Sequence, residues 1–177
     1  MPSTIALFAS SRRNGNTGRF MDRIAKELAI EVVDLAAMNI SCYDYEHQNR
    51  GDDFESVMKR ALEFDQIIFA TPIYWYAASP PMKVFLDRIT DFLDLPELLE
   101  EGRRLRGKHA FLVCTSIYDE PSPSFLNAFL DTFNYLGMRY GGVGHVNCKD
   151  GYVPTPHEPA AMAFAQCVRS SAREIPG

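Results

Sequence analysis

The sequence contains no Cys-x-x-Cys pair, no long stripe of Lys and Arg, and no apolar stretch that could span a membrane. The four cysteines, Cys42, Cys114, Cys148 and Cys167, lie far apart, which argues against zinc or iron–sulfur sites and indicates reduced thiols. The longest apolar runs are about six residues, against the roughly 20 that a membrane-spanning helix needs. The net charge of -5 disfavours nucleic acid as a partner, because phosphate binding needs a basic surface.

The N-terminus also lacks room for a signal peptide, since Met1 to Thr4 lead directly into a strand-like run. We therefore expect a cytoplasmic protein with no membrane partner. The hydrophobic fraction of 46% and the charged fraction of 23% are those of an ordinary globular domain. A chain of 177 residues fits one domain, so residues 1–177 are predicted to form a single unit.

Five short apolar runs predict the strands of a parallel sheet, because a strand covered on both faces is apolar throughout. These runs are residues 5–9, 31–35, 66–70, 110–114 and, more weakly, 142–146. Apolar residues at helical spacing between them predict a helix starting near Gly18 and further helices over 54–62, 82–93, 125–133 and 158–172. This alternation predicts an α/β fold with helices on both faces of the sheet, and in such folds ligands bind beyond the carboxyl ends of the strands.

Charged segments outside this pattern are interpreted as solvated surface. The connection 36–53 is polar and aromatic, and the connection 95–108 mixes acidic and basic residues. Within the predicted third helix, Lys83, Asp87 and Arg88 are expected to form surface charges at the spacing of neighbouring helical turns.

The loop after the first strand, residues 10–17 with the sequence SSRRNGNT, suits an anion. Unpaired N–H groups at a helix N-terminus attract phosphate, and Ser10, Asn16 and Thr17 add short polar side chains. The loop matches neither the dinucleotide fingerprint G-x-G-x-x-G nor the G-K-[ST] of nucleoside triphosphatases, which leaves a mononucleotide phosphate site. The alternative is a simple turn at Asn14-Gly15 followed by a helix cap.

Three consecutive aromatic residues, Tyr74, Trp75 and Tyr76, follow the third strand. At a cleft such residues can cover a flat heteroaromatic ring while their polar tips reach water. The alternative is an aromatic cluster that packs one loop against another. Pro80 and Pro81 fit the first turn of the next helix.

Together the two loops resemble one known family. The motif S-x-R-x-N-G-N-T after the first strand and P-I-Y-W-Y-x-x-S-x-x-x-K-x-x-x-D-R after the third are similar to those of the flavodoxin-like NAD(P)H-dependent FMN reductases and quinone reductases. The resemblance implies a flavodoxin-like three-layer sandwich with a five-stranded parallel sheet of order 2-1-3-4-5. It also implies FMN as the cofactor and NADPH or NADH as co-substrate, and a homodimer or homotetramer as the assembly.

The same resemblance implies the parts of the FMN site. The phosphate is expected at the first loop, and the isoalloxazine ring along the loop after the third strand, with backbone amides near its pyrimidine side. The loop after the fourth strand supplies further contacts, with Ser116 or Tyr118 as candidates for stabilising charge on the reduced ring. The candidate cofactor-binding residues are Ser10, Arg12, Asn14, Asn16, Thr17, Pro72, Ile73, Tyr74, Trp75, Thr115, Ser116 and Tyr118.

The sequence departs from the family in two places. Many members carry a Gly-rich loop after the fourth strand, where this chain has TSIYDEP over residues 115–121, so the outer edge of the pocket is left open. Iron–sulfur relatives carry a cysteine cluster after the second strand, where this chain has only Cys42, so neither a cluster nor any other metal is expected.

The expected function is electron transfer from NAD(P)H through FMN to a small flat acceptor, such as a quinone or a flavin. No catalytic side chain is required, because the flavin carries the electrons. His145 or His157 is a candidate proton donor, with an ordinary packing or surface role as the alternative. Two other functions stay open: a flavodoxin-type electron carrier without NAD(P)H activity, and a binding module without redox activity.

Overall fold

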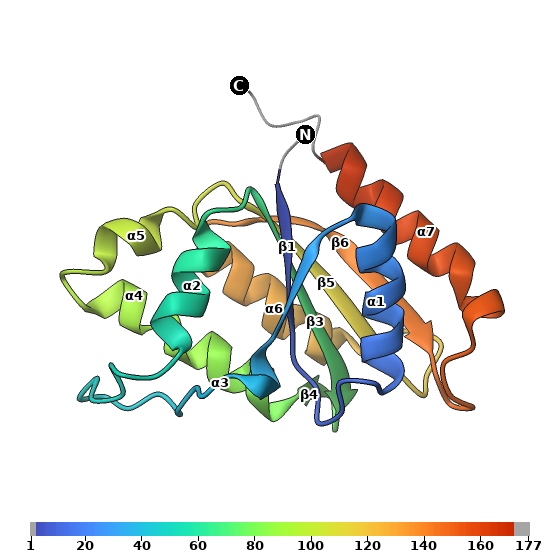
Figure 1. Ribbon diagram of the computed structural model, residues 1–177, viewed down its shortest axis with the longest axis horizontal. Helices are drawn as coiled ribbons and strands as arrows, with labels where there is room; N and C mark the ends of the chain where they lie inside the picture. Colours follow the sequence, from blue (N-terminus) through green and yellow to red (C-terminus); the bar gives the residue numbers. More distant parts are fainter. Residues whose placement is uncertain (1–2, 172–177) are drawn as a thin grey trace.

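The computed structural model describes residues 3–171 and contains the predicted parallel sheet (Figure 1). Its main strands are β1 (Thr4–Phe8), β2 (Glu31–Asp34), β3 (Gln66–Tyr74), β5 (His109–Ser116) and β6 (Arg139–Asn147). They pair in the order β2-β1-β3-β5-β6, all parallel, which confirms the predicted order 2-1-3-4-5. A short strand that the sequence did not indicate, β4 (Ala77–Ala78), pairs antiparallel with the end of β3.

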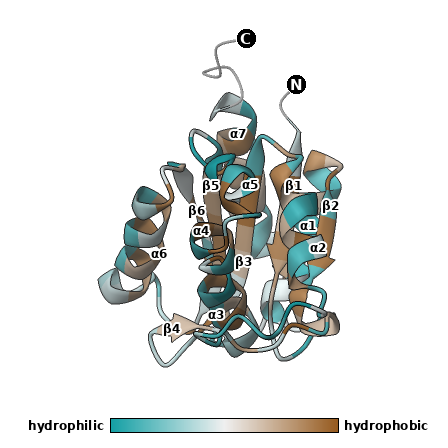
Figure 2. Cartoon of the chain, turned by 90° about the vertical axis from the view of Figure 1, so that its left-hand side faces the viewer, coloured by the Kyte–Doolittle hydropathy of each residue, from teal (hydrophilic) through white to brown (hydrophobic). Residues whose placement is uncertain are grey.

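Helices cover both faces of the sheet. The first face carries α1 (Asn16–Leu28) and α7 (Pro154–Ser171), and the second carries α2 (Phe54–Leu62), α3 (Pro80–Arg88) and α6 (Pro123–Tyr135). Successive strand residues point to opposite faces, so Ile67 and Ile68 join two separate clusters of buried side chains. This arrangement explains the uninterrupted apolar runs, and Figure 2 shows the hydrophobic residues concentrated in the strands.

Two predicted helix boundaries differ from the structure. The helix expected over 82–93 is two helices, α3 and α4 (Asp91–Asp94), and the closing helix begins at Pro154 rather than at Glu158. Prolines near the start of α7 obscured its first turn in the sequence, although proline is tolerated there. Ala172, the last residue of the predicted closing helix, lies outside the described residues.

The expectation that residues 95–108 form only a solvated connection was wrong. The segment contains α5 (Leu99–Arg103), and the side chains of Leu98 and Leu105 are 3% and 2% exposed. A Cβ on Gly102 would lie 2.2 Å from the carbonyl oxygen of Phe92, so the backbone of α5 packs directly against α4. Acidic and basic side chains on the outer surface concealed this packing in the sequence.

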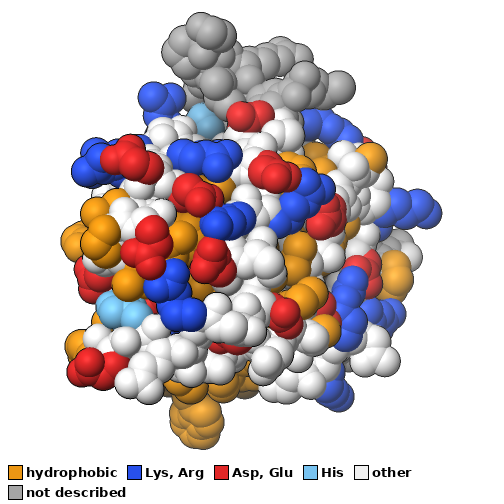
Figure 3. Space-filling view, turned by 60° about the vertical axis from the view of Figure 1, so that its left-hand side comes forward, with side chains coloured by type: hydrophobic (Ala, Val, Ile, Leu, Met, Phe, Trp, Pro, Cys, Tyr) orange, Lys and Arg blue, Asp and Glu red, His pale blue; other side chains and the backbone are white. Residues whose placement is uncertain are grey.

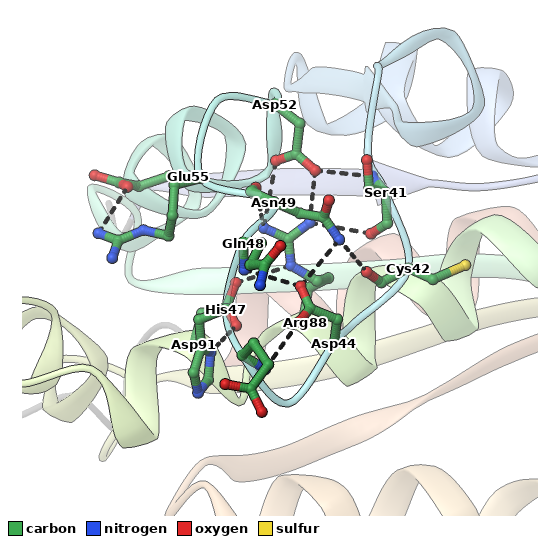
Figure 4. Close-up of polar contacts among 12 residues, drawn as sticks. Ser41, Cys42, Asp44, His47, Gln48, Asn49, Asp52, Glu55, Arg88 and Asp91 are labelled. Atoms are coloured by element: carbon green, nitrogen blue, oxygen red, sulfur yellow. Dashed lines mark hydrogen bonds and ion pairs between the residues drawn. The ribbon is translucent and has the colours of Figure 1, made fainter.

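Arg88 is buried rather than a surface charge as expected, and it anchors the connection that follows η1 (Leu35–Ala37) (Figure 4). Its guanidinium contacts the Asp52 carboxylate at 2.6 Å and the Asp91 carboxylate at 2.8 Å. It also donates to the backbone oxygens of Ser41 at 3.0 Å and Asn49 at 2.9 Å. Because each donor has an acceptor, a buried charge is tolerated here.

The carboxylates around Arg88 make further contacts. His47 Nδ1 lies 2.8 Å from Asp91 Oδ1, and the backbone N–H of Ser41 donates to Asp52 at 2.8 Å. Burial opposes ionisation of Asp52, but hydrogen bonds from Arg88, Ser41 and Phe54 outweigh it and lower the pKa of this carboxyl. The connection 39–53 is therefore held on α3 and α4 by ionic and backbone contacts.

No helix among residues 3–171 is both long enough and apolar enough to cross a bilayer.

We expect Arg88→Met to lower the free energy of unfolding by about 3–5 kcal/mol, because it leaves two buried carboxylates without their cation. Lys83→Met is the matched control on the same helix, since Lys83 pairs with Asp87 at the surface. An exposed pair contributes about 0–1 kcal/mol. Urea unfolding monitored by circular dichroism measures both variants, and equal losses for the two would contradict the buried role of Arg88.

Candidate functional site

A cavity of about 380 Å³ lies at the carboxyl ends of β1, β3 and β5, in the size range of small-molecule sites. All the predicted site residues except Asn14 line it. They are Ser10, Arg12, Asn16, Thr17, Pro72, Ile73, Tyr74, Trp75, Thr115, Ser116 and Tyr118. Asn14 is exposed in the turn before α1 and does not line the cavity. Sequence reasoning did not select Gly15, Tyr76, Ile117, Ser122 and Cys148, which also line it.

The first wall of the cavity is the loop between β1 and α1. Gly15 is the N-cap residue of α1, and no side chain accepts a hydrogen bond from the first turn of the helix. The alternative of an Asn16 or Thr17 side-chain cap is therefore not what the structure has. The first N–H groups of α1 remain available to an anion.

Asn16 and Thr17 instead connect neighbouring loops. The Asn16 side-chain oxygen accepts from the backbone N–H of Tyr152 at 3.0 Å, next to α7. The hydroxyl groups of Thr17 and Thr115 are 2.7 Å apart and buried, which joins α1 to the end of β5. These contacts fix the loop after β1 relative to the loops after β5 and β6.

Arg12 provides the positive charge at this wall. Among residues 3–171, no carboxylate lies within ion-pair distance of its guanidinium, whereas Arg13 pairs with Asp22 at 2.5 Å. No acidic side chain is present among the described residues that line the cavity. The electrostatic environment of this end of the cavity therefore favours an anion.

The second wall is the hairpin formed by β3 and β4. Tyr74 pairs with Ala77, and Trp75 and Tyr76 form the two-residue turn, with φ values of 48° and 64°. Two consecutive left-handed residues are typical of a type I′ turn, which usually contains Asn or Gly. Large side chains in this conformation store strain, and such strain is concentrated at functional sites.

This turn exposes its aromatic side chains. Trp75 is 95% exposed and Tyr76 is 55% exposed. Figure 3 shows hydrophobic side chains projecting beyond the lower edge of the molecule, the edge at which β4 lies in Figure 1. The expected packing of one loop against another therefore does not account for Trp75.

Buried hydroxyl groups hold the base of the hairpin. Ser79 donates from its backbone N–H to the Thr71 hydroxyl at 3.0 Å and from its own hydroxyl to the backbone oxygen of Ala9 at 2.9 Å. Farther out, burial and then hydrogen bonds from Ser11 and Ser10 act on Tyr74, and the net effect lowers the pKa of its phenol. The hairpin is thus attached to the loop after β1 at its base and through Tyr74.

The third wall is the loop after β5. The Tyr118 hydroxyl forms a hydrogen bond with Tyr76, which raises the pKa of Tyr118 and connects this loop to the hairpin. Ser122 caps α6 by accepting from the backbone N–H of Phe125 at 3.3 Å. No glycine occurs over residues 115–121, and side-chain hydrogen bonds shape this loop instead.

Two histidines were candidate proton donors, and the structure places them differently. His145 Nε2 lies 2.9 Å from the hydroxyl oxygen of Ser116, a residue of the cavity wall. His157 does not line the cavity, and its Nδ1 accepts from the backbone N–H of Val153 at 3.1 Å. Of the two, only His145 contacts a cavity residue.

Cys148 lies in the cavity wall after β6, a position that no local motif marks. Burial raises the pKa of its thiol to about 11, although the charge of Arg19 opposes this shift. The thiol is therefore protonated at neutral pH and is a poor nucleophile.

The chain matches a sequence model of the NADPH-dependent FMN reductase family over residues 2–152. It is 27% identical over 173 residues to YwqN of Bacillus subtilis, described as an NAD(P)H-dependent FMN-containing oxidoreductase, covering 92% of this chain and 94% of YwqN. Among solved structures, the Trp repressor binding protein of Bacillus subtilis superimposes with a TM-score of 0.69 and 24% identity, covering 92% of this chain and 96% of the other.

A second solved structure has a similar fold at lower identity. The FMN-dependent NADH-azoreductase of Bacillus anthracis, determined in complex with FMN, superimposes with a TM-score of 0.65 and 13% identity. The match covers 97% of this chain and 99% of the azoreductase. At this identity the likeness shows the shared fold.

Gly18→Ala tests the geometry of the first wall. A Cβ at this position would lie 1.7 Å from the backbone oxygen of Arg13, so the loop must move. We expect FMN affinity to fall at least tenfold, because displaced N–H groups lose hydrogen bonds to a charged group that contribute about 1.5–3 kcal/mol each.

Gly51→Ala is the control for this substitution, since nothing lies within 4 Å of its added Cβ. Quenching of FMN fluorescence measures the dissociation constant of each variant, and thermal unfolding checks that it is folded. A folded Gly18→Ala protein with unchanged affinity would contradict the proposed placement of the anion.

Proposed function

The chain belongs to the NADPH-dependent FMN reductase family and is an NAD(P)H-dependent flavin oxidoreductase with FMN as its cofactor; from this we propose that the cavity described above binds FMN and serves a small flat acceptor. Such an acceptor is a quinone or a free flavin. The observation that carries this proposal is the combination, in one cavity, of an uncapped helix N-terminus with an exposed aromatic hairpin.

The residues at the first wall fit the FMN phosphate. The N–H groups of the first turn of α1 supply donors, and the Arg12 guanidinium supplies a positive charge without a competing carboxylate. The hydroxyl of Ser10, which accepts from the backbone N–H of Arg12 at 3.4 Å, lies at the same wall. This donor set holds a phosphate without a metal ion.

The residues of the other two walls fit a flat ring. Pro72, Ile73 and Tyr74 present a largely apolar surface, and Thr115 and Ser116 place hydroxyl groups opposite it. When bound, FMN supplies the redox chemistry, carrying electrons from the reduced nicotinamide to the acceptor. The protein binds and orients the two partners and keeps the reacting surfaces close together.

The exposed aromatic side chains give the acceptor its binding surface. Trp75 and Tyr76 on the hairpin and Tyr118 on the opposite loop surround the opening of the cavity. Aromatic faces stack on flat ligands and require no specific hydrogen bonds. A quinone-like acceptor and the nicotinamide can therefore use the same surface in turn.

The assembly and location are proposed in the same way. We propose a homodimer or homotetramer, because Trp75 at 95% exposure and Tyr45 at 87% exposure are large apolar side chains that a partner subunit would cover. We also propose a cytoplasmic location, which suits four free cysteines. Size-exclusion chromatography with light scattering measures the assembly.

The decisive experiment is an anaerobic titration of the FMN-loaded protein with NADPH and with NADH, followed by stopped-flow absorbance. We expect bleaching of the bound flavin faster than that of free FMN, and the faster nucleotide identifies the donor. Tight FMN binding without bleaching would favour a flavodoxin-type carrier over the reductase. Absence of FMN binding would overturn the assignment of the cavity.

Trp75→Ala tests the acceptor surface. We expect kcat/KM for a quinone to fall about three- to tenfold, the equivalent of a stacking contribution of roughly 0.5–1.5 kcal/mol. Unfolding free energy should change by less than about 0.5 kcal/mol, because exposed substitutions have small effects. Tyr135→Ala is the control, an aromatic residue that is 81% exposed and does not line the cavity. Equal kinetics for Trp75→Ala and the control would remove Trp75 from the site.

A further inference from the structure

Ser116 is the last residue of β5, and its hydroxyl lies at the junction of the cavity and the edge strand β6. The hydroxyl oxygen accepts from the backbone N–H of Tyr118 at 3.1 Å and lies 2.9 Å from His145 Nε2. The backbone oxygen of Tyr118 is a more distant partner, at 3.3 Å. The ring of His145 therefore has the shortest contact with this hydroxyl.

The hydrogen bonds of the imidazole decide which atom carries the proton. Burial lowers the pKa of His145 below its ordinary value of 6.5, and a hydrogen bond to the backbone of Asp119 opposes this shift. A bond that raises the pKa is one in which the imidazole donates, and Nε2 faces Ser116, so Nδ1–H donates to the Asp119 carbonyl. In the neutral ring Nε2 is then an acceptor, and it accepts the hydroxyl proton of Ser116.

The charged neighbours of His145 come from three elements. Asp119 and Glu120, in the loop after β5, raise its pKa through their charges. Cys114 is its register partner on β5, and burial raises the pKa of that thiol to about 12, so it stays neutral. Helix α6, which packs on the same face, carries one charged side chain, Asp131.

These bonds leave one position open on the Ser116 oxygen. A serine hydroxyl has one proton and two acceptor positions. With neutral His145, the proton is directed to Nε2 and Tyr118 N–H occupies one acceptor position, so the second is available to the cavity. With protonated His145, Nε2–H occupies that second position, and the oxygen no longer accepts from a ligand.

We propose that His145 is a positioning residue that makes Ser116 a hydrogen-bond acceptor for an N–H on the ring of the bound flavin, and that protonation of His145 withdraws this acceptor. This inference rests on the proposed placement of FMN in the cavity. It assigns Ser116 an accepting role, in contrast to the charge-stabilising role expected from the sequence. The specificity is for an imide-type ring edge, which offers an N–H beside its carbonyl groups.

The sign of the pH dependence follows from this arrangement. Ligand binding favours neutral His145, so FMN affinity is highest above the His145 pKa and falls as the pH drops through it. Because that pKa lies below 6.5, the fall occurs on the acid side of neutrality. The FMN phosphate titrates in a similar range, so the test needs a variant that retains that background.

His145→Gln provides this comparison, because its side-chain carbonyl can accept the Ser116 proton but cannot titrate. FMN dissociation constants are measured by fluorescence quenching between pH 5 and pH 8. The wild-type protein should lose about three- to tenfold more affinity on acidification than His145→Gln, the equivalent of one neutral hydrogen bond. Ser116→Ala should bind about three- to tenfold more weakly at pH 8 and follow the pH profile of His145→Gln.

His157→Gln is the control histidine, since it does not line the cavity and should keep the wild-type profile. A second readout avoids dependence on variants: ¹⁵N chemical shifts of His145 in the wild-type protein at pH 8 should report an Nδ1–H tautomer. FMN binding with identical pH profiles for wild type and His145→Gln, or an Nε2–H tautomer, overturns this inference alone. Failure of the wild-type protein to bind FMN at any pH overturns the placement of FMN and this inference together.

Discussion

The parallel register of β1, β3 and β5 is the constraint on which the cavity depends. It aligns the carboxyl ends of three strands from distant parts of the chain, and a few buried hydrogen bonds fix the loops that follow. The backbone N–H of Ala9 donates to the carbonyl of Ala70 at 2.9 Å, and Ser79 donates to the carbonyl of Ala9 at the same distance. The Thr17 and Thr115 hydroxyls connect the first loop to the third. Because these contacts are buried, the walls of the cavity are positioned without help from a ligand.

The aromatic hairpin shows how a strained element can be maintained. Trp75 and Tyr76 adopt left-handed conformations that cost of order 1 kcal/mol or more each for non-glycine residues. The Thr71 and Ser79 hydroxyls fix the base of the hairpin, and the ladder pair of Tyr74 and Ala77 closes it. The strained turn therefore projects its two rings beyond the edge of the sheet instead of folding them into the core.

The fold and much of the candidate site could be predicted from the sequence because their signals are local. An apolar run marks each strand, and the polar or aromatic residues directly after it lie at the same edge of the sheet. The buried position of Arg88 depends on Asp52, which lies 36 residues away, and no local pattern reveals that pairing. Helix α5 was missed because its outward charges dominate its composition, while the close approach of Gly102 to Phe92 exists only in the folded chain. Cys148 reaches the cavity through the register of β6.

The loop after β5 illustrates how side chains can replace glycine in shaping a backbone. A Gly-rich loop adopts unusual conformations because it lacks Cβ atoms. Here the Asn147 amide donates to the Asp119 carboxylate at 2.9 Å, and Ser122 caps the helix that follows. Ser116 and His145 add a link to the edge strand. Such a loop is more rigid than a Gly-rich one, but its shape depends on the protonation of the groups that hold it, so this outer wall is the part of the cavity most exposed to changes in pH.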